Sequence, residues 1–204
     1  MIYAVVKCWA QSWLFVTGMP LTKVGKQPQK GKYIIVANHI SYLDSVLLFP
    51  SLPSYFRPLG KREFAKIPIM GFLYKQLAIM VDRSSVESRI KSMRLMWRIL
   101  KRESDILIFP EGTFNETGNP LKEFYNGAFR LAITSQTPIL PIIFADTQDR
   151  WHYSAWWKLW PGKNRTIYLD PVPVAEMTIE NLPVLKETVY RLMETTLIKY
   201  KTEI

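Results

Sequence analysis

The sequence predicts a single α/β domain with a mainly parallel central sheet, flanked by helices and preceded by an apolar N-terminal helix. Two observations indicate this fold. Short apolar runs alternate with longer segments of helical periodicity along most of the chain. The runs are apolar at nearly every position, as expected of parallel strands that are covered on both faces. The length of 204 residues and an apolar content of 48% suit one domain with a sizeable core.

The predicted elements follow one another from residue 33 onward. Each strand is inferred from a short apolar run, and each helix from apolar residues that recur at spacings of three and four. The pattern predicts strands at residues 33–37, 55–59, 78–81, 105–109, 139–144 and 166–169. It predicts helices near residues 42–49, 64–76, 85–102, 124–135 and 182–201.

The N-terminal segment is apolar over residues 2–19, but Lys7 and two uncharged polar residues interrupt it. Its longest uninterrupted stretch falls far short of the ~20 residues that span a bilayer. It also lacks a convincing small-residue cleavage site. We therefore expect an apolar, membrane-interacting helix over residues 1–22, which lies in a membrane interface or packs on the core, and a main domain over residues 23–204.

The composition points to an anionic partner. A net charge of +10 is expected of a chain that meets nucleic acid, an anionic membrane surface or a phosphorylated substrate. Seven tryptophans favour the membrane, because indole rings prefer the headgroup boundary. The single cysteine, Cys8, excludes an internal disulfide, and no cysteine–histidine cluster has the spacing of a zinc site. We therefore expect no metal.

Two segments are candidates for such a surface. Residues 151–160 hold four tryptophans, which either seat the chain on a bilayer or form an aromatic cluster under a loop. The same composition can stack on single-stranded nucleic acid, but no recognised module frames it, so we expect no nucleic-acid partner. The predicted helix at 85–102 is strongly basic. It presents either a solvated face or a surface for anionic lipid or an acidic carrier protein.

Polar residues follow four of the predicted strands. In parallel α/β sheets, chemistry gathers at the carboxyl ends of the strands, so these residues form the candidate site. They are Asn38 and His39, then Gly60 and Lys61, then Asp82 and Arg83, then Pro110, Glu111 and Gly112.

His39 follows the first buried strand, and Asp44 lies five residues further on. Histidine exchanges a proton near neutral pH, and a carboxylate on its other ring nitrogen would fix the tautomer. Ser41 and Asp44 also match a helix-opening capping box, in which Asp44 serves only the helix end. The two interpretations are compatible if His39 precedes the helix and Asp44 lies in its first turn.

The segment at 109–113, Phe-Pro-Glu-Gly-Thr, follows another buried strand. Its Gly112 would let a ligand approach the backbone, with Glu111 held at the sheet end. The alternative is an ordinary turn whose glutamate pairs with a surface lysine. Lys61 and Arg83 each precede a predicted helix and would suit a phosphate, unless Arg83 merely pairs with its neighbouring aspartate at the surface.

Taken in order, these blocks resemble the glycerolipid acyltransferase family of the 1-acyl-sn-glycerol-3-phosphate acyltransferase type. They are Asn-His-x4-Asp, Lys-x-Glu with Pro and Gly beyond, Asp-Arg, Phe-Pro-Glu-Gly-Thr and Pro-Ile-Leu-Pro-Ile, all within residues 33–144. The resemblance implies a membrane-associated enzyme on the cytoplasmic face of a membrane. Such an enzyme moves a fatty acyl group from acyl-CoA or acyl-carrier protein to lysophosphatidic acid, giving phosphatidic acid.

The resemblance also implies roles for particular residues. His39 and Asp44 would be catalytic, as the base and its orienting carboxylate. Substrate-binding roles would fall to Asn38, Lys61, Arg83, Glu111, Gly112 and Thr113. The family uses no metal and no bound cofactor. The implied partners are a lysophospholipid acceptor, the acyl donor and an anionic membrane surface.

One position departs from the family pattern. The arginine that usually follows Phe-Pro-Glu-Gly-Thr, and helps to hold the acceptor phosphate, is Phe114 here. Either Lys61 and Arg83 suffice for the phosphate, alone or with Lys122 or Arg130, or the acceptor is not a phosphate ester. The alternative acceptor is then the hydroxyl of a lyso-amino-acid lipid. An alternative of a different class is a non-catalytic module that binds anionic membranes, for which His39 would be dispensable.

Overall fold

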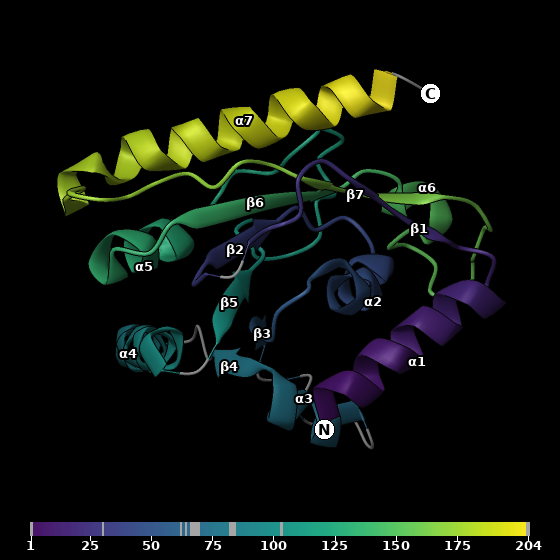
Figure 1. Ribbon diagram of the computed structural model, residues 1–204, viewed down its shortest axis with the longest axis horizontal. Coiled ribbons are helices and arrows are strands. Elements are labelled where there is room, and N and C mark those ends of the chain that lie inside the picture. The colour runs from purple at the N-terminus through teal and green to yellow at the C-terminus, as the bar shows by residue number, and fades with distance from the viewer. Residues whose placement is uncertain are drawn as a thin grey trace.

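The computed structural model describes residues 2–29, 31–61, 63, 65, 70–81, 85–102 and 104–202. In this part of the chain, one seven-stranded sheet runs between two layers of helices (Figure 1). The strands are β1 (Leu21–Val24), β2 (Ile34–Ala37), β3 (Phe56–Lys61), β4 (Ile79–Val81), β5 (Asp105–Ile108), β6 (Ile139–Phe144) and β7 (Asn164–Tyr168). The helices are α1 (Ile2–Val16), α2 (Tyr42–Ser51), α3 (Met70–Leu77), α4 (Val86–Arg102), α5 (Gly127–Ser135), α6 (Thr147–Arg150) and α7 (Leu182–Thr202), with a 3-10 helix at Ile179–Asn181.

The sheet order is β1-β7-β6-β2-β5-β3-β4. The neighbouring strands pair in parallel except β6 and β7, which are antiparallel. This confirms the predicted α/β fold with a mainly parallel sheet. Strand β1 and helix α6 were not predicted. Their signals are weak because β1 is a four-residue edge strand with two exposed polar positions, and α6 is a single turn.

Strand β2 explains why the strands are apolar throughout. Its four residues are all buried, and they alternate between two cores. Ile34 and Val36 join the core under α4, α5 and α7, whereas Ile35 and Ala37 join the core under α1 and α2. A central parallel strand therefore needs an apolar side chain at every position.

Helix α1 packs on α2 and buries Val6, Ala10 and Leu14, which lie one turn apart. None of the described helices is both long and apolar enough to cross a membrane. The expected boundary between segments 1–22 and 23–204 falls inside β1, which pairs with β7. The helix and the sheet are thus joined directly through this edge strand.

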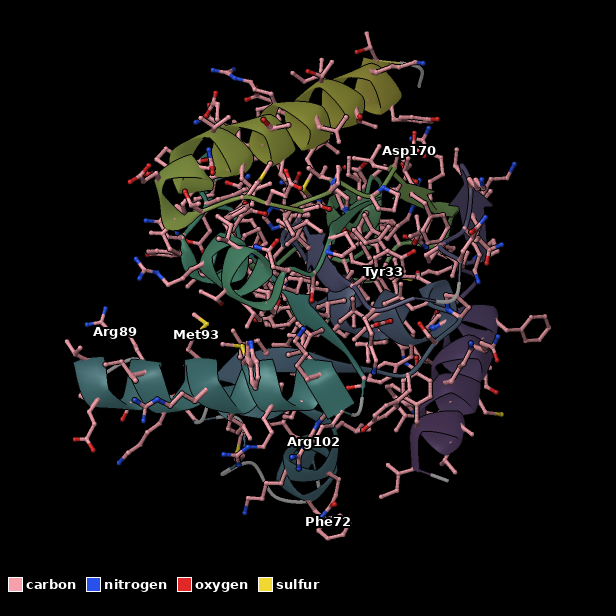
Figure 2. The ribbon with its side chains drawn as sticks, turned by 60° about the vertical axis from the view of Figure 1, so that its left-hand side comes forward. Tyr33, Phe72, Arg89, Met93, Arg102 and Asp170 are labelled. Atoms are coloured by element: carbon pink, nitrogen blue, oxygen red, sulfur yellow. The ribbon has the colours of Figure 1, made fainter. Side chains whose placement is uncertain are left out.

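The helix expected at 64–76 is described only from Met70, and residues 64 and 66–69 lie outside the described part. The strongly basic helix is α4, which buries Ser92, Met96 and Leu100. Its basic side chains are all exposed, and Arg89 lies near the free N-terminal end of the helix (Figure 2).

Candidate active site

The candidate site lies where β2 and β5 end. These strands are parallel neighbours, with Val36 opposite Ile108, so the segments that follow them leave the sheet at the same edge. His39 follows β2 and Glu111 follows β5. The predicted residues of the Asn-His-x4-Asp and Phe-Pro-Glu-Gly-Thr motifs are therefore brought together by the sheet order.

The His39 imidazole is held by Asp44. The Nδ1 atom of His39 lies 3.0 Å from Oδ2 of Asp44, whose side chain is fully buried, while the histidine side chain keeps 17% of its surface exposed. A carboxylate at Nδ1 favours the tautomer that carries its proton on this nitrogen, which leaves Nε2 free to accept a proton. This geometry is that of a general base with an orienting carboxylate.

The first turn of α2 aims Asp44 back at the histidine. Ser41 is the N-cap, and its side chain accepts a hydrogen bond from the backbone N–H of Leu43. Oδ2 of Asp44 accepts from the backbone N–H groups of Ile40 (2.7 Å) and Ser41 (2.9 Å). The predicted capping box is thus present, and the same carboxylate oxygen also meets His39, so the two interpretations of this motif coexist.

Glu111 is fully buried beneath the site. Its carboxylate accepts the backbone N–H of His39 (2.8 Å) on one oxygen and that of Lys122 (2.9 Å) on the other. Burial, opposed by these two hydrogen bonds, raises the pKa of Glu111 to about 7. Glu111 therefore fixes the backbone that carries His39 and does not form the surface lysine pair of the alternative interpretation.

The remaining residues of the two motifs have defined surroundings. The Asn38 amide exchanges two hydrogen bonds with the backbone of Phe144, of 3.0 and 2.8 Å, so it joins β2 to β6. Gly112 adopts a φ of 77°, a left-handed conformation that suits glycine. Thr113 is exposed, and its hydroxyl accepts a hydrogen bond from the ammonium group of Lys122 (2.9 Å).

Aromatic side chains enclose the histidine ring. Phe109 stacks on it with 4.0 Å between ring centroids, and Phe114 packs at 4.4 Å and 59°. Tyr42 meets Phe114 edge-on at 5.0 Å. Sequence reasoning marked Phe114 only as a missing arginine and gave Phe109 no role beside the histidine; it named Lys122 only as a further cation for the phosphate. The signal available for both phenylalanines was their position on either side of the Pro-Glu-Gly-Thr run.

The predicted phosphate cations are only partly placed. The Lys61 backbone ends β3 and pairs with Val81, whereas the Lys61 side chain lies outside the described part of the structure. Arg83 also lies outside the described residues. Their binding of a phosphate stays a prediction.

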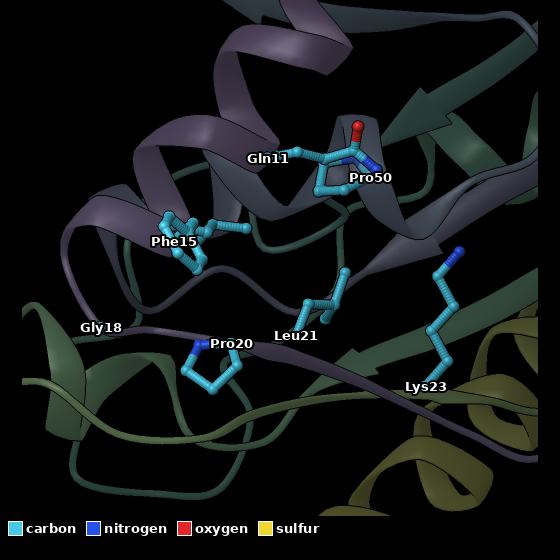
Figure 3. A pocket seen from close by; sticks show the side chains of 8 residues that line it. Gln11, Phe15, Gly18, Pro20, Leu21, Lys23 and Pro50 are labelled. Carbon is cyan, nitrogen blue, oxygen red and sulfur yellow. The ribbon is translucent and has the colours of Figure 1, made fainter.

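Two cavities lie away from the histidine. One, of about 500 Å³, opens between α1, β1 and the end of α2 and is lined by Phe15, Lys23 and Pro50 among others (Figure 3). The other, of about 460 Å³, lies between Lys122 and α7. His39 lines neither cavity. Within the described ranges, no cluster of three acidic, histidine or cysteine side chains is placed to hold a metal.

Fold and site together define the class: an α/β protein with a histidine–aspartate pair at the carboxyl edge of its mainly parallel sheet. The acyltransferase family model matches residues 21–145, more than half of the chain. The chain belongs to this acyltransferase family.

Curated relatives share the family. The chain is 30% identical over 178 residues to 1-acyl-sn-glycerol-3-phosphate acyltransferase alpha of Mus musculus and of Homo sapiens, which covers 86% of this chain and 62% of each relative. It is 28% identical over 171 residues to the 1-acyl-sn-glycerol-3-phosphate acyltransferase of Limnanthes douglasii, covering 83% of this chain and 60% of that one. The chain thus spans about three fifths of the length of these relatives.

A solved structure has the same fold. The crystal structure of the 1-acyl-sn-glycerophosphate (LPA) acyltransferase PlsC from Thermotoga maritima superposes with a TM-score of 0.82. The match covers 98% of this chain and 79% of that one at 21% sequence identity. At this level of sequence identity the similarity confirms the predicted fold and is no evidence about function.

Proposed function

We propose that this protein is an O-acyltransferase that moves a fatty acyl group from a thioester to the free hydroxyl of lysophosphatidic acid, giving phosphatidic acid. The observation that carries the proposal is the contact of Asp44 with Nδ1 of His39, which leaves Nε2 as the base. The acceptor in the names of the curated relatives, a 1-acyl-sn-glycerol-3-phosphate, supports this choice.

The proposed reaction needs no group beyond the chain and its two substrates. Nε2 of His39 takes the proton of the acceptor hydroxyl while that oxygen attacks the thioester carbonyl carbon. The tetrahedral intermediate then collapses, the C–S bond breaks, and the imidazolium returns the proton to the leaving thiolate. Asp44 stabilises the imidazolium in between. The donor is acyl-CoA or acyl-carrier protein.

Asp44→Asn is the sharpest test. An asparagine can still accept the backbone N–H groups of Ile40 and Ser41, but it cannot stabilise the imidazolium, so we expect acyl transfer to fall by roughly 10²–10⁴-fold with little loss of stability. His39→Ala should abolish transfer, and Asp170→Asn, an exposed carboxylate, should leave it unchanged. The assay is mass spectrometry of the acylated product with both donor types, alongside thermal unfolding.

The same variants separate an enzyme from a non-catalytic membrane module. A folded His39→Ala protein with full transfer activity would refute the proposed mechanism. A parent protein that binds anionic vesicles and transfers no acyl group to any acceptor would favour the binding module.

We further propose peripheral association with the cytoplasmic face of a membrane. The outward face of α1 supports it, because the exposed residues of this helix include Val5, Trp9, Phe15 and Val16 and no charged residue. The single charged side chain of α1, Lys7, donates instead to the backbone carbonyl of Leu52. A surface helix without exposed charge suits an interface with lipid.

A second acceptor class is favoured by Phe114. Its ring lies on His39, where the family arginine would meet the acceptor phosphate. A lyso-amino-acid lipid, whose headgroup lacks that phosphate, would be compatible with this apolar wall. Offering purified protein a lyso-aminolipid and lysophosphatidic acid in competition decides between them, because the acceptor that gives the larger kcat/KM is the substrate.

A further inference from the structure

The segment after α6 forms an unusual surface at the edge of the site. Trp156, Trp157 and Trp160 are 69%, 64% and 64% exposed. We call residues 156–160 the Trp loop. Residues 151–163 contain no acidic side chain, and Lys158 and Lys163 in this segment are exposed. Several large indole rings exposed together are uncommon on a surface that contacts only water, and they indicate a site of interaction with a partner or a membrane.

The residues that directly follow the Trp loop contact the residues that directly follow α1. The backbone N–H of Gly162 donates to the carbonyl of Gly18 (2.9 Å). A Cβ placed on Gly18 would lie 3.2 Å from the Pro161 side chain, so the two segments are in close contact. At the end of α1, Phe15 and Val16 are 86% and 81% exposed. Two exposed apolar regions, far apart in sequence, therefore adjoin.

The fourth tryptophan of this segment has a different position. Trp151 is half-buried and stacks on Trp13 of α1 with 5.4 Å between centroids. Its indole N–H donates to the backbone carbonyl of Trp156 (2.9 Å). Trp151 thus anchors the Trp loop to α1, while the other three indoles face outward.

The same segment also borders the histidine. The hydroxyl of Ser41, the N-cap beside the His39–Asp44 pair, donates to the carbonyl of Trp151. The Tyr42 ring lies 5.6 Å from Trp151. The Phe114 ring lies 6.3 Å from Tyr153. The exposed apolar surface is therefore adjacent to the aromatic side chains that enclose His39.

We propose that the Trp loop and the end of α1 form one contact with a lipid bilayer, which seats the opening of the His39 site at headgroup level. The proposal rests on the proposed lipid acyl transfer. A bilayer fits better than a protein partner, because indole rings prefer the headgroup region and lysines pair with anionic lipids. The groove of Figure 3 opens beside Phe15 with Lys23 in its wall, which extends this surface with another cation.

The test removes the three outward indoles together, as Trp156→Ala, Trp157→Ala and Trp160→Ala. The rings of Trp156 and Trp157 pack edge-on against each other, and all three indoles are mostly exposed, so the fold should persist. We expect binding to vesicles of phosphatidylcholine and phosphatidylglycerol to weaken by about tenfold or more. The matched control removes three exposed apolar side chains of α7, as Val184→Ala, Leu192→Ala and Ile198→Ala, and should bind within about twofold of the parent. Equal loss in both variants, or no loss in the first, would overturn the proposal.

An activity comparison separates this proposal from the proposed function. With the acceptor embedded in vesicles, the Trp-loop variant should transfer at least about tenfold more slowly than the parent, and with a water-soluble short-chain acceptor at the same rate. A loss with the soluble acceptor as well would overturn the docking role. The docking role would also be overturned if analytical ultracentrifugation showed that the parent is a dimer and the Trp-loop variant is a monomer. If the parent acylates no acceptor, the proposed function fails and vesicle binding still decides this proposal.

Discussion

At the residue scale, a single carboxylate oxygen of Asp44 contacts both the catalytic candidate His39 and the start of a helix. Oδ2 of Asp44 meets Nδ1 of His39 and also accepts two backbone N–H groups at the start of α2. The helix cap therefore fixes the carboxylate, and the carboxylate fixes the imidazole. Such a shared acceptor holds a histidine in one tautomer without any further side chain.

Glu111 shows how a buried carboxylate can serve the backbone. Its raised pKa, about 7 against an ordinary 4.5, means that the folded state holds its proton more tightly than the unfolded state does. The stability linked to this proton is fully present below pH 4.5 and is lost as the pH rises through 7.

Glu111→Gln should reveal this pH dependence. Between pH 4.5 and 7 the parent should lose up to about 3 kcal/mol of unfolding free energy relative to the variant, since glutamine does not titrate. Urea unfolding of both proteins across this range measures the difference. A difference that stays constant with pH would contradict the burial of an ionisable Glu111.

At the element scale, the N-terminus of α2 links the site to the segment behind it. The Ser41 hydroxyl accepts from the backbone of Leu43 and donates to the carbonyl of Trp151. Because Ser41 is fully buried, both partners would lose their hydrogen bond together if the hydroxyl were removed.

Ser41→Ala should therefore cost about 1–3 kcal/mol of unfolding free energy. Acyl transfer should fall less than in Asp44→Asn, because the alanine backbone still donates to Asp44. The matched control is Thr178→Ala, an exposed N-cap of the 3-10 helix far along the chain, which should cost less and leave transfer unchanged. Equal destabilisation of the two variants, measured by thermal unfolding, would show that the hydrogen bond from Ser41 to Trp151 does not contribute to stability.

At the scale of the whole molecule, charge and apolar surface act together. The chain carries 27 basic and 17 acidic residues, and the exposed side of α4 is strongly basic. Long-range attraction to an anionic surface is screened by salt, whereas the burial of indole rings is not.

Vesicle binding should therefore have two components. Raising the salt concentration from about 0.05 M to about 0.5 M should weaken binding of the parent to anionic vesicles. The binding that remains at the higher salt concentration should depend on the Trp loop. The Trp-loop variant should lose most of its binding over the same range. Vesicle sedimentation at several salt concentrations measures both, and salt-independent binding of the variant would contradict the electrostatic component.

The sequence predicted more of the fold than of the site. Of the seven strands in the described residues, six were predicted within two residues at each end, because apolar runs such as Ile34–Ala37 admit few other structures. His39 and Asp44 were also singled out, since their contact is local. The roles of Asn38 and Glu111 were not foreseen as backbone contacts, because their partners lie in other strands or loops.

What the sequence determined by itself was the alternation of buried strands and helices, and which polar residues follow the strand ends. Burial is a property of each residue and its near neighbours, so local pattern suffices to predict it. Only the tertiary structure decided that Glu111 holds the backbone of His39, 72 residues away, and that Phe114 lies on its ring. Only the tertiary structure divided the tryptophans between an anchored Trp151 and three exposed rings. Such contacts depend on strand order and register, which bring together residues whose separation along the chain carries no signal.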